Sequence, residues 1–226
     1  MARCVTFTPI AGVASVPNVR MMHAQTAAPV GIANVAGLVA QARAKLGRRN
    51  DGAGGNGSAR HLAGQRFKAQ AGVFMVHIPT ADGDPAPLAL PALLSGQVEL
   101  NSDPLAAASA NIRCSKLRAI AVTTAAPAGA MPEGPTMAES RGSLGLAHFD
   151  IHTWFGLFGA AKLPADVTQR LNQAYRDALD PPGLKARLSG PMAERMASTP
   201  AQLGAFVKSE LATYEAVVKA SGATLG

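Results

Sequence analysis

The stretch NDGAGGNGSARHLAGQRFKAQAGVFMVHI, residues 50–78, carries the clearest local signals for the fold. Its glycine-rich beginning, residues 50–57, predicts a loop, and Ser58 stands where the N-cap of a helix belongs. Apolar residues at helical spacing follow, and Gly72 is a natural C-terminal stop for this helix. The apolar run 73–78 then predicts a strand. A helix followed at once by a buried strand is typical of an α/β protein.

The same alternation of strands and helices extends to both sides of this stretch. The strands are continuously apolar, which predicts a parallel sheet with helices on both faces. The strands are predicted at residues 16–23, 73–78, 98–100 and 117–123, and the helices at 34–46, 58–71, 88–94 and 105–112.

The C-terminal part of the chain is predicted to hold one strand and two amphipathic helices. A connector rich in Ala, Pro and Gly, residues 125–140, precedes a strand over 149–158. The first helix is predicted at 165–179. The second begins at a capping box, with Thr199 as the N-cap and Gln202 three residues later. The apolar stripes of both helices predict that they are packing elements.

Composition and charge favour a folded protein with a basic surface. Hydrophobic residues make up 48% of the chain and charged residues 15%, which indicates a globular protein. The net charge of +7 invites a nucleic-acid interpretation, but aromatic residues are only 4%, too few for a base-stacking platform. We therefore expect no nucleic-acid partner, and a basic surface also attracts anionic small molecules.

The glycine-rich loop is the local feature with most chemical promise. Gly52, Gly54 and Gly57 satisfy G-x-G-x-x-G and lead into a helix, where exposed backbone N–H groups can bind a phosphate or a carboxylate. A dinucleotide site is disfavoured, because the polar residues 48–51 stand where a buried strand belongs. No Lys-Ser/Thr pair follows Gly57, so a Walker loop is excluded. Anion binding and a plain tight turn both stay open.

Catalytic and metal-binding motifs are not found in the sequence. There is no G-x-S-x-G elbow and no H-E-x-x-H pattern, and Cys4 and Cys114 have no metal-ligand spacing around them. His61 and His77, on a predicted helix and a predicted strand, fit interior histidines better than ligands or catalytic bases. We therefore predict a protein that is not an enzyme and has neither a cofactor nor a metal site.

Many segments of the chain resemble the substrate-binding proteins of tripartite tricarboxylate transporters, also called Bug receptors. They occur in one collinear order over nearly the whole chain, so the series is specific although no single motif is decisive. The similar segments are residues 7–10, 13–19, 55–58, 61–64, 67–73, 75–79, 94–100, 116–123, 135–139, 154–158 and 198–222.

The resemblance implies a two-lobed periplasmic binding protein (type II) fold of class α/β. One lobe, near complete, is expected over residues 16–124, with a parallel sheet and flanking helices. The other lobe is partial and is expected to comprise residues 1–15 and 125–226, with hinge segments and the C-terminal helices. Such a receptor closes on a small carboxylate and delivers it to the membrane permease subunits of the transporter. The resemblance places it in the periplasm, and we expect a monomer.

The resemblance also implies a ligand site between the lobes, where backbone N–H groups, hydroxyls and ordered waters hold the carboxylates. One contributor matches an acid at the start of a helix, and another is a segment of the second lobe beside the cleft. The residues implied are Gly54, Gly55, Asn56, Gly57 and Ser58 of the glycine loop, the acid Asp103, and Thr153 and Trp154 of the second lobe.

The sequence departs from the family pattern in ways that bear on binding. We expect that the chain lacks the family's N-terminal portion, and residues 1–25 give no convincing export signal, so a cytoplasmic location as expressed stays open. Asp51 adds a negative charge to the glycine loop, and Pro104 follows Asp103 where the family has Asn. Two alternatives stay open: a truncated receptor remnant that binds no ligand, and an enzyme that handles an anion or phosphate at the glycine loop.

Overall fold

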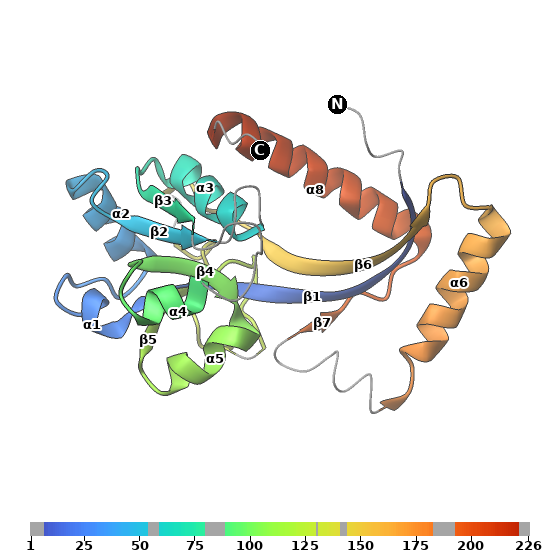
Figure 1. The fold of residues 1–226 in the computed structure, drawn as a ribbon, viewed down its shortest axis with the longest axis horizontal. Coiled ribbons are helices and arrows are strands. Elements are labelled where there is room, and N and C mark those ends of the chain that lie inside the picture. The colour runs from blue at the N-terminus through green and yellow to red at the C-terminus, as the bar shows by residue number, and fades with distance from the viewer. Residues whose placement is uncertain are drawn as a thin grey trace. The chain divides into compact units, whose positions relative to one another are not determined.

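The computed structural model describes residues 7–53, 59–79, 89–129, 131–140, 144–182 and 193–221 (Figure 1). The chain forms two compact units. The larger unit comprises Pro17–His152 and Ala216–Gly226, and the smaller unit comprises Met1–Val16 and Thr153–Glu215.

A mixed sheet forms the centre of the larger unit. Its strand order is β3-β2-β4-β1-β5. β2 is parallel to β3 and β4, whereas β1 is antiparallel to β4 and β5. The strands are β1 (Phe7–His23, with Pro17 onward in this unit), β2 (Asn50–Ala53), β3 (Val76–Pro79), β4 (Leu100–Pro104) and β5 (Leu117–Val122).

The prediction of a wholly parallel sheet was therefore wrong. Apolar strands that alternate with helices indicate a layered α/β unit, but the alternation contains no information on which strands become neighbours. β4 and β5 run in the same direction, and β1 lies between them in the opposite direction. The insertion of β1 is a long-range pairing, and its direction has no local sequence signal.

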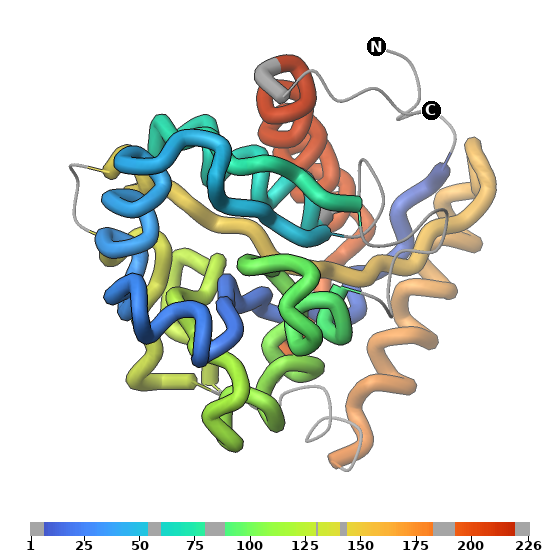
Figure 2. Tube along the Cα trace, turned by 60° about the vertical axis from the view of Figure 1, so that its left-hand side comes forward, coloured from blue at the N-terminus to red at the C-terminus, as the bar shows by residue number. Residues whose placement is uncertain are grey.

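Helices cover both faces of this sheet, as predicted. They are α1 (Ala24–Ala27), α2 (Val35–Ala44), α3 (Ala59–Ala71), α4 (Ala89–Leu94) and α5 (Leu105–Arg113). Successive residues of β1 belong to different cores, because side chains alternate across a strand. Met22 packs with buried residues of α2 and α3, including Leu38 and Phe67, whereas Met21 packs with Leu93 and Leu105 of α4 and α5. The tube view in Figure 2 shows the two helical layers.

Local signals located the helix ends of the larger unit well. Asn34 caps α2, and its side-chain oxygen accepts a hydrogen bond from the Gly37 N–H at 2.9 Å. Gly72, with φ of +60°, follows the last residue of α3 and adopts the left-handed conformation that glycine favours. The predicted N-cap of α3, Ser58, lies outside the described residues.

The prediction of a loop over residues 50–57 was wrong for its first half, because Asn50–Ala53 forms β2. This strand is polar, yet Asp51 is buried with 4% of its surface exposed. Its charge is compensated by Arg20 on β1, since Arg20 Nη2 lies 2.9 Å from Asp51 Oδ2. Gly52 allows close packing, because a Cβ atom at this position would lie 2.7 Å from Val98 Cγ2. A buried ion pair and a glycine contact thus replace the apolar side chains that a central strand ordinarily carries.

The smaller unit contains the first part of β1 together with two strands that pair with it. They are β6 (His152–Ala160, with Thr153 onward in this unit) and β7 (Glu194–Arg195). β1 begins at Phe7 rather than at the predicted residue 16, and β6 ends slightly later than predicted. Its helices are α6 (Ala165–Ala178) and α8 (Pro200–Ser221, through Glu215 in this unit).

The apolar stripes of α6 and α8 are only partly buried. Leu203 of α8 is 1% exposed, whereas Leu171 of α6 and Leu211 of α8 are 41% and 47% exposed. Among the helices in the described ranges, none is long and apolar enough to cross a lipid bilayer.

The predicted capping box of α8 is confirmed. The Gln202 N–H donates to Thr199 Oγ1 at 3.2 Å, and the Thr199 N–H donates to Gln202 Oε1 at 2.9 Å. Replacing Thr199 with alanine leaves a helix N–H without its acceptor, so we expect the free energy of unfolding to fall by about 1 kcal/mol. Urea unfolding followed by circular dichroism measures this change. Ser209→Ala, at an exposed position in the middle of α8, is the control and should not destabilise the protein.

Candidate functional site

The predicted site residues fall in different parts of the chain. Residues 54–58, the glycine loop that contains Gly54, Asn56 and Ser58, lie outside the described residues. Asp103 is near the end of β4 in the larger unit. Thr153 and Trp154 are on β6 in the smaller unit.

Asp103 is buried and held by two donors in the larger unit. An Nη1 group of Arg60, in the first turn of α3, donates to Asp103 Oδ1. The side-chain amide of Asn101 donates to Asp103 Oδ2 at 2.9 Å. Burial raises the pKa of Asp103, and the charge and hydrogen bond of Arg60 oppose this effect. The Arg60–Asp103 ion pair therefore joins the first turn of α3 to the end of β4, and the two charges neutralise each other.

A second buried ion pair, Arg20–Asp51, lies under the same helix. Arg20 is 1% exposed, and its Nη1 donates to Ser102 Oγ at 3.1 Å. The Arg20 guanidinium carbon also lies 5.3 Å from the centre of the Phe67 ring on α3, within cation–π range. The negative charge of Asp51, expected to disfavour an anion, is thus compensated inside the larger unit.

Arg20 and Arg60 were missed by the sequence reasoning. Arg20 interrupts the apolar run of β1, which is a signal that a buried charge needs a partner. Arg60 had no comparable signal, because a basic residue at the start of a helix is ordinarily solvated. Gly64 is a further feature of this region, since a Cβ atom there would lie 2.5 Å from Asp51 Oδ2. Only glycine lets α3 approach the ion pair so closely.

His61 and His77 form a close pair of rings beside Asp51. Their ring centres are 4.1 Å apart, and Gln65 Nε2 lies 2.9 Å from His61 Nε2. Burial lowers the pKa of His61 to about 4, with smaller contributions from His77 and Lys68. Burial also lowers the pKa of His77, against an opposing effect of Asp51. Both rings are therefore neutral at pH 7, and His61 has the interior character that was predicted.

Replacing His61 with glutamine is expected to reduce the loss of stability on acidification. The unfolded chain binds more protons at this site than the folded chain between the folded pKa of about 4 and the ordinary value of 6.5. Stability is therefore fully present above the ordinary value and falls as the pH drops toward the folded pKa. We expect His61 to account for about 1–3 kcal/mol of that fall.

Urea unfolding at about pH 7 and at about pH 4.5 measures this difference. The wild type should lose more stability between the two conditions than His61→Gln. The matched control is His148→Gln, since the His148 side chain is exposed. Equal losses in the wild type and in His61→Gln would contradict the assignment.

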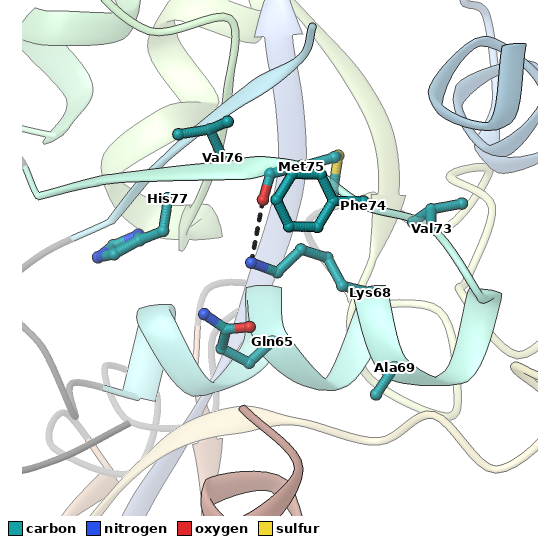
Figure 3. Close-up of a pocket in the computed structure, with 8 residues that line it drawn as sticks. All are labelled: Gln65, Lys68, Ala69, Val73, Phe74, Met75, Val76 and His77. Carbon is teal, nitrogen blue, oxygen red and sulfur yellow. Dashed lines mark hydrogen bonds between the residues drawn. The ribbon is translucent and has the colours of Figure 1, made fainter. Parts of the chain in front are cut away.

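A pocket of about 450 Å³ opens between α3 and the segment that leads into β3 (Figure 3). Lys68 extends from α3 toward this segment, and its Nζ donates to the Met75 carbonyl at 3.2 Å. None of the predicted site residues in the described part of the chain lines the pocket. Its lining residues are Gln65, Lys68, Ala69, Val73, Phe74, Met75, Val76 and His77.

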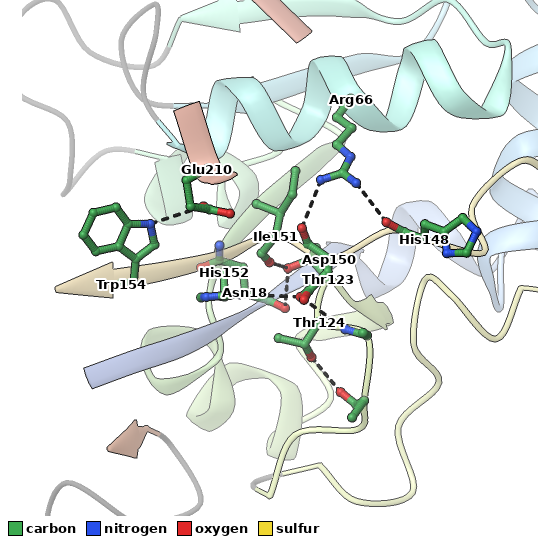
Figure 4. A network of polar contacts seen from close by, with 12 residues as sticks. Asn18, Arg66, Thr123, Thr124, His148, Asp150, Ile151, His152, Trp154 and Glu210 are labelled. Atoms are coloured by element: carbon green, nitrogen blue, oxygen red, sulfur yellow. Dashed lines mark hydrogen bonds and ion pairs between the residues drawn. The ribbon is translucent and has the colours of Figure 1, made fainter. Parts of the chain in front are cut away.

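A network of polar contacts fixes the end of the larger unit's chain before β6 (Figure 4). Arg66 of α3 donates to the carbonyl groups of His148 and Asp150, at 2.8 and 3.0 Å. The Thr123 hydroxyl donates to the Ile151 carbonyl at 2.5 Å. A hydrogen bond from His152 lowers the pKa of Asp150. Residues 148–152 are thereby attached to both α3 and the end of β5.

Trp154, in the smaller unit, is oriented by α8. Its indole N–H donates to Glu210 Oε2 at 3.3 Å. Its ring meets Phe206 edge-on, with ring centres 5.2 Å apart, and lies 6.4 Å from the ring of Phe158. Trp154 is the only tryptophan of the chain, so its fluorescence reports on this cluster alone.

The described residues offer no site for a metal ion, because no group of three or more His, Cys, Asp or Glu side chains is close enough to hold one. The polar groups at α3 form ion pairs and neutral histidines rather than a nucleophile activated by a base.

Comparison with known proteins shows which family the chain belongs to. A family model described as "Tripartite tricarboxylate transporter family receptor" matches residues 2–223. The UPF0065 protein in the tcbD-tcbE intergenic region of Pseudomonas sp. (strain P51) is 27% identical over 212 residues, 94% of this chain and 60% of the relative. A UPF0065 protein of Pseudomonas knackmussii, from the clcB-clcD intergenic region, is 31% identical over 157 residues, 70% of this chain and 89% of the relative. The chain thus spans less than two thirds of the Pseudomonas sp. relative.

Solved structures show the same fold. R. palustris Rpa4515 with adipate matches 99% of this chain and 71% of its own, with a TM-score of 0.80 and 26% identity. MatC from Rhodopseudomonas palustris with bound malate matches 94% of this chain and 69% of its own, with a TM-score of 0.77 and 25% identity. The structure of the periplasmic binding protein BugD matches 97% of this chain and 71% of its own, with a TM-score of 0.78 and 26% identity.

These matches confirm the predicted α/β fold of periplasmic binding proteins. The matching family consists of receptors rather than enzymes, which agrees with the prediction that the chain is not an enzyme. The family model covers nearly the whole sequence, from the first strand through the last helix. The chain therefore belongs to the tripartite tricarboxylate transporter receptor family.

Proposed function

We propose that this protein is an extracytoplasmic receptor that binds a small carboxylate and delivers it to the permease subunits of a tripartite tricarboxylate transporter. The observation that carries the proposal is the family match over residues 2–223. Two proteins of the same fold, with TM-scores of 0.80 and 0.77, contain adipate and malate in their structures. Both ligands are dicarboxylates, so a dicarboxylate is the first class to test.

The proposed site combines the glycine loop, residues 54–58, with Asp103, Thr153 and Trp154. The role of the loop rests on its resemblance to the family's ligand-facing loop and on its place before α3. A helix N-terminus offers N–H groups and a favourable dipole to a carboxylate. Arg60, in the first turn of α3, adds a positive charge that Asp103 already compensates. We infer that the backbone donors contribute more to anion binding than this arginine does.

The proposed mechanism is closure of two lobes on the ligand. Residues 16–124 are proposed as the main part of one lobe, and residues 1–15 with 125–226 as the source of the other, although residues 125–152 and 216–226 belong to the larger compact unit. Periplasmic location and a monomeric receptor are part of the same proposal. The periplasmic assignment is supported by the likeness to BugD, which is described as a periplasmic binding protein.

Calorimetric titration with malate, adipate, amino acids and nucleotides tests the function. Saturable heat with carboxylates alone supports the receptor, and heat with nucleotides alone contradicts it. No heat with any member of the panel would favour a protein that binds none of these ligands.

Replacing Thr153 with alanine is expected to weaken binding of the preferred carboxylate by about tenfold, because a hydrogen bond to a charged group is lost. Ser209→Ala removes an exposed hydroxyl of α8 and is the matched control. Titration of both variants with the carboxylate that binds the wild type best makes the comparison. Equal affinities in the two variants would remove Thr153 from the site.

A further inference from the structure

Three apolar side chains are exposed next to one another in the larger unit. Leu46 is 67% exposed, Phe74 is 58% exposed and Val76 is 39% exposed. Backbone hydrogen bonds join the segments that carry them. The Gly47 N–H, next to Leu46, donates to the Phe74 carbonyl at 3.4 Å, and the Val76 N–H donates to the Arg49 carbonyl at 2.9 Å.

Exposed basic residues flank Leu46 in the sequence. Arg43, Lys45 and Arg48 come from the end of α2 and the turn that follows it. Arg43 is held toward the group, since its Nη2 donates to the Ala71 carbonyl at 2.7 Å. The only acid in residues 24–79 is Asp51, which is buried against Arg20. We call Leu46, Phe74 and Val76 with Arg43, Lys45 and Arg48 the Phe74 surface.

The Phe74 surface continues into the pocket beside α3. Phe74 and Val76 line this pocket together with Lys68 (Figure 3). The pocket has a volume of about 450 Å³, large enough to accept one apolar side chain. β3 is also the terminal strand of the sheet, at the end of the order β3-β2-β4-β1-β5. An exposed apolar group at a sheet edge, with a pocket and flanking basic residues, is typical of an interaction site.

We propose that the Phe74 surface docks a segment of a partner protein in which apolar side chains are flanked by acidic residues. Charge complementarity selects this occupant, because the three exposed charged residues of the Phe74 surface are all basic. A second copy using the same surface would bring like charges together. A membrane with anionic lipids would also satisfy the basic residues, but it supplies no single side chain to insert into the pocket beside α3. This inference does not depend on carboxylate binding by the chain.

Fluorescence anisotropy with the full chain tests the proposal. The probe is a fluorescein-labelled peptide in which Leu and Val alternate with Asp and Glu, and the control peptide has Lys in place of each acid. We expect the acidic peptide to bind and the control peptide not to bind. The affinity should fall as salt is added, because exposed charges are screened.

Two pairs of variants connect the binding to this surface. Phe74→Ser should weaken binding about tenfold, whereas Phe7→Ser, at a position 64% exposed in the smaller unit, should not. Lys45→Glu with Arg48→Glu should weaken binding at least about tenfold. Arg170→Glu with Lys208→Glu makes the same change in net charge at exposed positions of α6 and α8, and should have a much smaller effect.

The outcomes separate the proposal from its competitors. The proposal is supported if the acidic peptide binds and both Phe74-surface variants weaken it more than their controls. It is overturned if neither peptide binds at the highest soluble concentration, or if the matched controls weaken binding equally. It is also overturned if phosphatidylglycerol vesicles bind with the same variant dependence and the peptide does not. Circular dichroism of each variant confirms that the fold is intact.

Discussion

Replacing Asp51 with alanine is expected to lower the free energy of unfolding by about 3–5 kcal/mol, because it leaves the charge of Arg20 buried without its partner. The Arg20 and Asp51 side chains are only 1% and 6% exposed, and their N–O distance is 2.9 Å. Both charges are therefore almost fully removed from bulk water in the folded protein. Urea unfolding followed by circular dichroism measures the change.

Two controls separate this effect from a general sensitivity to charge removal. Asp180→Ala removes a carboxylate that is 69% exposed and lies 3.7 Å from Arg195, and should cost at most about 1 kcal/mol. The double variant Arg20→Met with Asp51→Leu should recover most of the stability, because Arg20 Nε and Asp51 Oδ1 have no hydrogen-bond partner among the described residues. Equal losses for Asp51→Ala and Asp180→Ala would contradict the assignment of a buried pair.

Replacing Phe67 with alanine should also lower the free energy of unfolding by about 3–5 kcal/mol. Phe67 is 1% exposed, packs in the core formed by α2, α3 and β1, and lies under the Arg20 guanidinium. The variant leaves a cavity and removes the cation–π contact. Urea unfolding gives the value, and Phe67→Leu should cost clearly less because most of the cavity stays filled.

Phe74→Ala is the matched control for this prediction. The same side chain is removed seven positions along the chain, but Phe74 is 58% exposed and its loss should change stability by about 0.5 kcal/mol or less. A loss of several kcal/mol in Phe74→Ala would mean that the Phe74 surface contributes to the fold rather than to docking.

Helix ends were predictable because their signals are local. The Thr199–Gln202 capping box and the position of Gly72 depend on residues within a few positions of one another, and both were found where the sequence placed them. The direction of β1 was not predictable in this way. It depends on pairing with β4 and β5, which are far away in the sequence.

Strand β2 shows how a long-range partner can reverse a local expectation. The polarity of residues 50–53 indicated a loop, because an unpaired Asp51 would be costly to bury. Arg20, from another strand, forms an ion pair with Asp51 and offsets the free-energy cost of burying its charge. The same limitation applies to the candidate site. Asp103 was identified through a resemblance, but its partner Arg60 became apparent only from the structure.

The protein is proposed to recognise its ligand through the ligand's carboxylate groups. The most direct measurement is calorimetric titration of the full chain with the best-binding dicarboxylate of the panel and with its dimethyl ester. The two compounds have the same carbon chain, but the ester has no negative charge. We predict saturable heat with the dicarboxylate and none with the ester. Equal binding of both compounds, or no heat with any carboxylate of the panel, would contradict the claim.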